Sequence, residues 1–181
     1  MRVVSGRLKG FNVDVPGGIR PTTSRVRKSI FSLLKEEVKG KRVLDIFSGS
    51  GILGVEALSL GSKSCDFVDL KKSCCMFIKK SLSSLGLRDK GNVFCKDAFS
   101  FIKRACIKGF RYDIIFADPP YFKDYALKTL KSLQDCDILS PQGFLVLQVF
   151  LKDRIVLESA NLELVLKKRY GQDLLLFFKH V

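Results

Sequence analysis

The sequence predicts an α/β fold in which a mostly parallel sheet is covered by helices on both faces. From residue 42 onward, short apolar stretches alternate with stretches that carry apolar residues at helical spacing. The last two apolar stretches, 162–169 and 173–179, have no helix between them, which indicates an antiparallel hairpin at one edge of the sheet. With 181 residues, 46% of them hydrophobic, the chain is long enough to bury one core.

The first 40 residues precede this alternating pattern. Residues 2–15 alternate loosely and contain two glycines, which predicts a small β-hairpin. Residues 24–38 carry apolar side chains at helical spacing, with Ser24 as a possible N-cap and Gly40 as a terminator. We therefore expect an N-terminal extension, made of a hairpin and a helix, over residues 1–40 and a main domain over residues 41–181.

The main domain divides into nine further elements before the terminal hairpin. The expected strands are 42–47, 64–69, 92–96, 112–117 and 143–149. The expected helices are 51–60, 72–85, 98–107 and about 124–135.

The net charge is strongly positive. The chain has 32 basic and 18 acidic residues, which gives +14. Residues 1–42 hold 11 of the basic and 3 of the acidic residues, a local net charge of +8. Such a surface favours a polyanion, although a merely solvated basic surface has the same composition. The residues expected to contact RNA phosphate are Arg2, Arg7, Lys9, Arg20, Arg25, Arg27 and Lys28.

Three of these cations, Arg25, Arg27 and Lys28, fall in the first turn of the expected helix. The helix dipole disfavours cations there, so an anion is expected nearby, unless the turn is simply a solvated face.

Other residue types argue against several classes of protein. Six cysteines without a C-x-x-C pair and one histidine make a metal site improbable and fit a reducing cytoplasm. No apolar run approaches a membrane span, and the first residues lack the apolar stretch of a signal peptide. We expect a cytoplasmic monomer without metal or membrane contact.

A glycine-rich turn follows the first strand of the main domain. Gly49, Gly51 and Gly54 form G-x-G-x-x-G between a strand and a helix, a pattern that dinucleotide enzymes and methyltransferases share. Asp45 lies four residues before the first glycine, where a pyrophosphate would be repelled and a cation favoured. S-adenosylmethionine carries an ammonium and a sulfonium, and the charge at Asp45 therefore favours this methyl donor.

Two further carboxylates end the next strands. Asp69 is expected to accept both ribose hydroxyls, and Asp97 to approach the adenine amino group beside the backbone of Ala98. Either residue alone is more often a helix cap. Three acids at three successive strand ends favour a ligand site, to which we add the neighbours Phe47 and Leu70.

The fourth strand ends in ADPPY. Asp118 and the carbonyl of Pro119 could hold an exocyclic amine with its lone pair aimed at the methyl group, and Pro120 would fix that geometry. Tyr121 offers a flat face for an extruded base. The alternative is a strand that two prolines terminate, with Tyr121 in the core.

Taken together, the chain resembles the RsmD family of bacterial ribosomal RNA guanine-N2 methyltransferases. The resemblance rests on the blocks RVVSGRLKGF, RPTTSRVRKSIFSLL, VLDIFSGSGILGVEALSLG, FVD and DPPY, in that order. It implies a seven-stranded, Rossmann-like class I fold that uses S-adenosylmethionine on a guanine of 16S rRNA in an assembling 30S subunit. The chain departs from the family pattern at Asp69, where Glu is more usual, and at Lys28 and Gln148, where an acid is common.

Two alternatives stay open. One is methylation of another amino nitrogen, in adenine (N6) of RNA or DNA or in a protein glutamine; such enzymes more often carry Asn at the position of Asp118. The other is a non-catalytic RNA-binding protein, against which the intact motifs argue.

Overall fold

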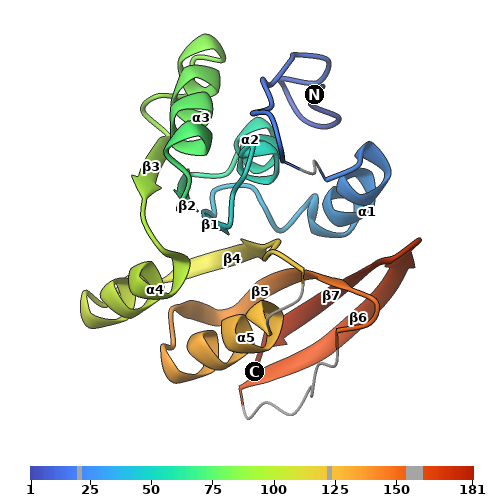
Figure 1. Ribbon diagram of the computed structural model, residues 1–181, viewed down its shortest axis with the longest axis vertical. Coiled ribbons are helices and arrows are strands. Elements are labelled where there is room, and N and C mark those ends of the chain that lie inside the picture. Colours follow the sequence, from blue (N-terminus) through green and yellow to red (C-terminus); the bar gives the residue numbers. More distant parts are fainter. Residues whose placement is uncertain (20–21, 122–123, 154–160) are drawn as a thin grey trace.

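The computed structural model describes residues 1–181 except 20–21, 122–123 and 154–160. Within this part, seven strands form one sheet in the order β3-β2-β1-β4-β5-β7-β6 (Figure 1). The strands are β1 (Arg42–Ile46), β2 (Ser64–Asp69), β3 (Gly91–Cys95), β4 (Tyr112–Ala117), β5 (Leu139–Phe150), β6 (Leu162–Tyr170) and β7 (Asp173–His180). Strands β1 to β5 pair in parallel, and β7 runs antiparallel to both β5 and β6. The predicted α/β class and the hairpin at the sheet edge are confirmed.

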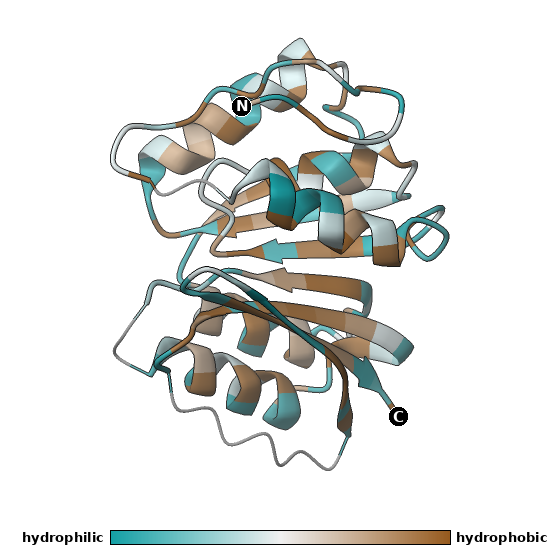
Figure 2. Cartoon of the chain, turned by 90° about the vertical axis from the view of Figure 1, so that its right-hand side faces the viewer, coloured by the Kyte–Doolittle hydropathy of each residue, from teal (hydrophilic) through white to brown (hydrophobic). Residues whose placement is uncertain are grey.

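In the described part of the chain, five helices cover the two faces of the sheet. They are α1 (Ser24–Leu34), α2 (Ile52–Ser59), α3 (Lys72–Ser84), α4 (Ala98–Ile107) and α5 (Tyr125–Asp135). Buried side chains of α1, α2 and α3 join one hydrophobic cluster, and those of α4 and α5 join another. Strand β1 contributes side chains to both clusters, since Val43 belongs to the first and Leu44 to the second. The mainly hydrophobic strands therefore lie between two helical layers, as Figure 2 shows.

The first 15 residues do not form the predicted β-hairpin strands. Only an isolated antiparallel bridge joins Arg2 to Asn12. Backbone hydrogen bonds within the segment, such as that from the N–H of Val3 to the carbonyl of Phe11 at 2.9 Å, hold it as an irregular loop. The N–H of Arg7 also donates to the carbonyl of Ser59 of α2 at 3.0 Å. Because the segment buries apolar side chains in the same cluster as α1, α2 and α3, it packs as part of that layer. The domain boundary at residue 40 stays a prediction.

The first helix differs from the prediction at both ends. Its N-cap is Thr23, one residue before the expected Ser24, and the Thr23 hydroxyl accepts from the N–H of Val26 at 3.3 Å. It ends at Leu34, after which a turn carries Val38 into the core.

A buried ion pair joins α1 to α2. The Nη1 atom of Arg27 lies 2.5 Å from Oε1 of Glu56, and the side chains are 3% and 0% exposed. Arg27 also donates to the carbonyls of Arg2 and Thr22, at 2.9 and 3.3 Å. The Glu56 carboxylate accepts the backbone N–H groups of residues 4–5 at 2.8 and 3.0 Å. This network therefore ties three separate segments together.

The prediction that Arg27 contacts RNA phosphate is wrong. Its guanidinium is buried, and all of its described partners are groups of the protein. An anion was expected near the first turn of the helix, and for Arg27 that anion is the Glu56 carboxylate.

We expect Arg27→Gln to lower the free energy of unfolding by about 3–5 kcal/mol, because it leaves the Glu56 carboxylate buried without its counter-charge. The matched control is Lys28→Gln, an exposed cation of the same helix turn, which should change stability by less than about 0.5 kcal/mol. Urea titration of both variants measures the difference. Equal stability of the two variants would contradict a structural role for the ion pair.

Candidate functional site

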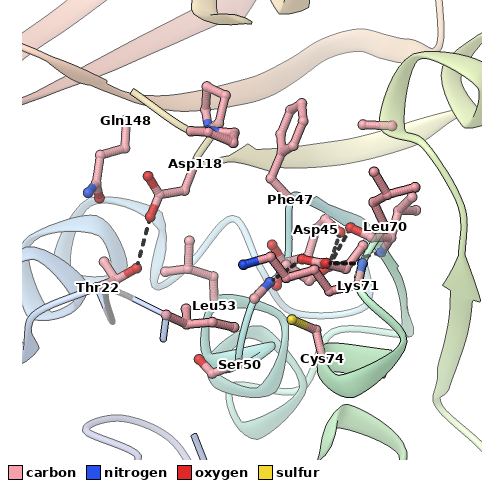
Figure 3. A pocket seen from close by; sticks show the side chains of 18 of the residues that line it. Thr22, Asp45, Phe47, Ser50, Leu53, Leu70, Lys71, Cys74, Asp118 and Gln148 are labelled. Atoms are coloured by element: carbon pink, nitrogen blue, oxygen red, sulfur yellow. Dashed lines mark hydrogen bonds between the residues drawn. The ribbon is translucent and has the colours of Figure 1, made fainter. Parts of the chain in front are cut away.

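A cleft of about 370 Å³ opens at the carboxyl ends of β1, β2 and β4 (Figure 3). Ligands of open α/β sheets bind at this edge, where the strand order reverses between β1 and β4. The predicted cofactor and catalytic residues that line it are Asp45, Phe47, Gly49, Asp69, Leu70, Asp97, Ala98, Asp118, Pro119, Pro120 and Tyr121. The structure thus brings together residues from four separate motifs.

Gly51 is the exception, because it does not line the described cleft. It forms the N-cap of α2 with φ 73°, and a Cβ atom there would lie 2.9 Å from Ile78. The turn and the packing against α3 therefore require this glycine. Gly49, with φ 54°, does line the cleft, and its N–H donates to Asp69 at 2.8 Å.

Asp45 is the most deeply buried carboxylate of the cleft, with 2% exposure. One oxygen accepts the N–H of Gly54 at 3.0 Å, which ties the end of β1 to α2. Burial raises the pKa of Asp45 well above its usual value; the Gly54 hydrogen bond lowers it, and the charges of Asp118 and Asp69 raise it further. A cation bound beside Asp45 would favour the ionised carboxylate, and would so oppose the effects of burial and of the neighbouring negative charges on its pKa.

The other two strand-end acids already make backbone contacts. Asp69 accepts the N–H of Gly49 on one oxygen and that of Lys71 on the other, each at 2.8 Å. Asp97 caps α4 by accepting the N–H of Ser100 at 2.9 Å, which matches the alternative helix-cap interpretation. Both carboxylates nevertheless line the cleft, and their positions are fixed before any ligand arrives.

The charge of the cleft is opposite to that of the whole chain. Among the residues that the structure describes, five carboxylates and two lysines line the cleft, in a chain of net charge +14. The acids are Asp45, Asp69, Asp97, Asp118 and Asp173, and the lysines are Lys71 and Lys96. These residues fit a ligand with an ammonium, a sulfonium and ribose hydroxyls, as in S-adenosylmethionine, and they disfavour a pyrophosphate.

Asp118 follows β4 at the centre of the cleft. Its Oδ2 accepts from the hydroxyl of Thr22 at 3.3 Å (Figure 3). Thr22 is 8% exposed, and its carbonyl accepts from Arg27, so the Arg27–Glu56 network reaches this corner. The extension that was expected to bind RNA therefore also helps to form the cleft.

Tyr121 is anchored at both its ring and its hydroxyl. The phenol donates to Asp173, and the ring lies 5.4 Å from that of Phe150, tilted by 37°. Burial and the hydrogen bond to Asp173 raise the pKa of Tyr121 to about 12, so the phenol keeps its proton at neutral pH. The Tyr121 side chain therefore lines the cleft while its contacts with Asp173 of β7 and Phe150 of β5 attach it to the sheet.

Sequence reasoning missed several lining residues. Thr22 belongs to the extension and reaches the cleft only through the packing of α1. Gln148 was noted as a departure from the family pattern but was not assigned to the site, although it lies near the carboxyl end of β5. Asp173 could have been found, because it begins an antiparallel strand beside that end. Tyr125 adds an aromatic ring, 6.2 Å from that of Phe47.

The seven cations predicted to contact RNA phosphate separate into three groups. Five are exposed, on the first segment and on α1: Arg2, Arg7, Lys9, Arg25 and Lys28. Arg27 is buried, and Arg20 lies outside the described residues. In the part of the chain that the structure describes, no three side chains are arranged to hold a metal ion. None of the described helices is both long and apolar enough to cross a membrane.

Comparison with known proteins places these features in a family. The model of the family described as Conserved hypothetical protein 95 matches residues 1–179. The protein named "Putative rRNA methyltransferase YlbH" of Bacillus subtilis (strain 168) is 36% identical over 174 residues, which cover 94% of each chain. "Ribosomal RNA small subunit methyltransferase D" of Buchnera aphidicola (subsp. Acyrthosiphon pisum) is 30% identical over 94% of this chain and 88% of its own.

The fold is also similar to that of a solved structure whose name includes the word methyltransferase. That of "Putative methyltransferase yhhF from Escherichia coli" superposes with a TM-score of 0.88 at 28% identity and covers 99% of this chain and 97% of its own. The chain therefore belongs to the Conserved hypothetical protein 95 family, the RsmD family that its motifs resemble.

Proposed function

We propose that this protein transfers a methyl group from S-adenosylmethionine to the N2 amino group of a guanine in 16S rRNA, within an assembling 30S subunit in the cytoplasm. The observation that carries the proposal is the position of Asp118, an acceptor-only side chain when ionised, in a cleft whose other acids suit a cationic cofactor. The names of the two relatives support rRNA as the substrate.

The cofactor half of the cleft lies over β1 and β2. Asp45 would pair with the ammonium, Asp69 would accept from the ribose hydroxyls, and Asp97 with Ala98 would face the adenine. Phe47 adjoins them with φ 57°, a conformation that a bulky residue rarely adopts and that marks a constrained site. S-adenosylmethionine, when bound, supplies an electrophilic methyl group on its sulfonium.

The substrate half is the ADPPY corner. An exocyclic amine is a weak nucleophile, because its lone pair is delocalised into the ring. The carboxylate of Asp118 and the carbonyl of Pro119 would accept the amine hydrogens and orient the lone pair toward the methyl group. Pro120 stiffens the corner, and Tyr121, fixed by Asp173, supports the extruded base. The proton of the alkylated nitrogen leaves to Asp118 or to water.

The identity of the side chain at Asp118 favours guanine. The Watson–Crick edge of guanine presents two adjacent donors, N1–H and the N2 amino group, and an ionised carboxylate accepts from both. Adenine presents an acceptor at N1 beside its N6 donor, which suits an amide side chain. N2 is also the one exocyclic amine of guanine.

The exposed cations of the extension would bind the rRNA backbone. Five of them lie on the first segment and α1, the same layer that supplies Thr22 to the cleft. Phosphate contacts there would hold the nucleic acid while one base enters the acidic cleft.

We expect Asp45→Asn to weaken S-adenosylhomocysteine binding at least roughly tenfold, because an amide keeps the contact to Gly54 but loses the charge-assisted hydrogen bond. The affinity of the parent should fall as the pH is lowered, since protonation of Asp45 removes the charge, and its raised pKa makes the fall begin at a higher pH than for an ordinary carboxylate. In Asp45→Asn this pH dependence should flatten.

Isothermal titration calorimetry measures both effects. The matched control is Asp66→Asn, another buried carboxylate of the sheet, which bonds Tyr112 and Asn92 and lies outside the cleft lining. Equal affinity of Asp45→Asn and the parent would refute the assigned role of Asp45.

We expect Asp118→Asn to keep the fold and the cofactor affinity but to slow methyl transfer at least roughly tenfold, because one misplaced donor costs about 1–3 kcal/mol. The assay is transfer of label from S-adenosylmethionine to unmodified small ribosomal subunits, followed by nucleoside analysis. Label in N2-methylguanosine supports the proposal. Label in N6-methyladenosine, or an Asp118→Asn rate equal to that of the parent, would overturn it.

We expect the double variant Arg25→Gln, Lys28→Gln to bind rRNA more weakly and with a lower salt dependence, by about 0.7–0.9 log unit in slope for each phosphate that is no longer neutralised. The double variant Lys72→Gln, Lys79→Gln removes the same charge from exposed positions of α3. Filter binding at several salt concentrations compares them. If both pairs change the slope equally, net charge and not the extension governs binding.

A further inference from the structure

One buried polar atom of the cleft lacks a hydrogen-bond partner among the described residues. It is the Oε1 atom of Gln148, a residue of β5 that is 6% exposed and lines the cleft. A buried acceptor left unsatisfied destabilises the folded state, so such an atom in a cleft indicates a ligand that donates to it.

The position of Gln148 places this atom on the substrate side. Strands β4 and β5 pair in parallel, with Ala117 opposite Leu147. Asp118 and Gln148 come directly after these two residues, so they are neighbours across the two strands. Figure 3 shows Gln148 beside Asp118 and on the other side of the cleft from Lys71. The amide therefore adjoins the proposed amine-binding group and not the expected ribose site.

The orientation of the amide follows from hydrogen-bond polarity. The single proton of the Tyr121 hydroxyl goes to the carboxylate of Asp173. The phenol oxygen can then only accept, and because Oε1 of Gln148 has no partner among the described residues, the hydrogen bond between these two side chains runs from the amide nitrogen to the phenol oxygen. The amide nitrogen is thus committed to Tyr121, which leaves Oε1 as the group that faces a ligand.

We propose that Oε1 of Gln148 accepts an N–H from the Watson–Crick edge of the target guanine and, with Asp118, discriminates guanine from adenine. This inference rests on the proposed function. The guanine edge carries three N–H hydrogens, one on N1 and two on N2. Asp118 and the Pro119 carbonyl would accept the two on N2, and Oε1 of Gln148 would share the N1–H with Asp118. The N1 atom of adenine would instead face an acceptor without a proton between them, which is repulsive.

The Asp173–Tyr121–Gln148 chain explains why an amide can serve as a fixed acceptor. A glutamine normally presents either its oxygen or its nitrogen by rotating about its last torsion. Here a flip would place the oxygen of Gln148 against the phenol oxygen, two acceptors in contact. Tyr121 is therefore a positioning residue for Gln148 in addition to any contact with the base.

The test compares Gln148→Met with Gln148→Glu. Methionine has similar length but lacks the acceptor, and glutamate keeps an acceptor at the same place. We expect Gln148→Met to lower kcat/KM for unmodified small ribosomal subunits at least tenfold, with the affinity for S-adenosylhomocysteine and the urea midpoint unchanged. Gln148→Glu should retain more activity than Gln148→Met.

A double-variant cycle tests the orientation. Tyr121→Phe removes the hydroxyl that directs the amide, and part of its effect should vanish in the Gln148→Met background. Additive effects of the two changes would overturn the positioning role of Tyr121.

The remaining outcomes separate the two proposals. If Gln148→Met transfers label to guanine as fast as the parent, or if it loses cofactor affinity, the assignment of Gln148 is wrong while the proposed function stands. If the parent places no label in guanosine of the subunits, the proposed function fails, and the assignment of Gln148 fails with it.

Discussion

The pairing of β1 with β4 is the constraint on which the cleft depends. These strands are far apart in the sequence, yet their parallel register sets Ile46 opposite Ala117. Asp45 and Asp118 therefore come to the same edge of the sheet, close enough for the charge of one to raise the pKa of the other. Backbone hydrogen bonds of the central strands hold these like charges together, and their repulsion is what a cationic ligand would relieve.

The first 40 residues take part in the site and do not simply adjoin it. Glu56, on the helix that follows the glycine turn, forms an ion pair with Arg27. Arg27 donates a hydrogen bond to the carbonyl of Thr22, and the Thr22 hydroxyl donates one to Asp118. The turn that would receive the cofactor and the corner that would receive the base are thus connected through the extension. A change in how the extension packs would alter both halves of the cleft.

The sequence predicted the fold and the main motifs well, because they depend on local patterns. The elements 64–69, 98–107 and 112–117 occur with those same bounds, since apolar runs with clear turn residues on both sides define them. Strand β5 begins at Leu139, four residues earlier than expected, and continues through Pro141 and Gly143. Leu139 pairs with Tyr112, but the register then shifts before Phe144 pairs with Ile114. Gln142, between these two turn-type residues, has φ 62°, so they lie in an irregular stretch within the strand.

What the sequence could not predict depends on contacts between distant residues. Arg27 and Lys28 are adjacent cations in the same helix turn, and no local pattern tells which one faces Glu56. The orientation of the Gln148 amide likewise depends on Tyr121 and Asp173, which belong to different segments. Asp97 is both a helix cap and a cleft residue, so its two interpretations were never exclusive.

The reversal of charge between surface and cleft has a consequence for competing ligands. Free nucleoside triphosphates carry the same bases as RNA, but each base is joined by a short linker to three phosphates. A cleft lined, among the described residues, by five carboxylates and two lysines would repel those phosphates, whereas the exposed cations of the extension would attract a polynucleotide backbone outside it. Under the proposed function, this arrangement would filter ligands by charge: a base would enter only when its phosphates can remain outside, as in a long strand, and free mononucleotides would be kept from the cofactor.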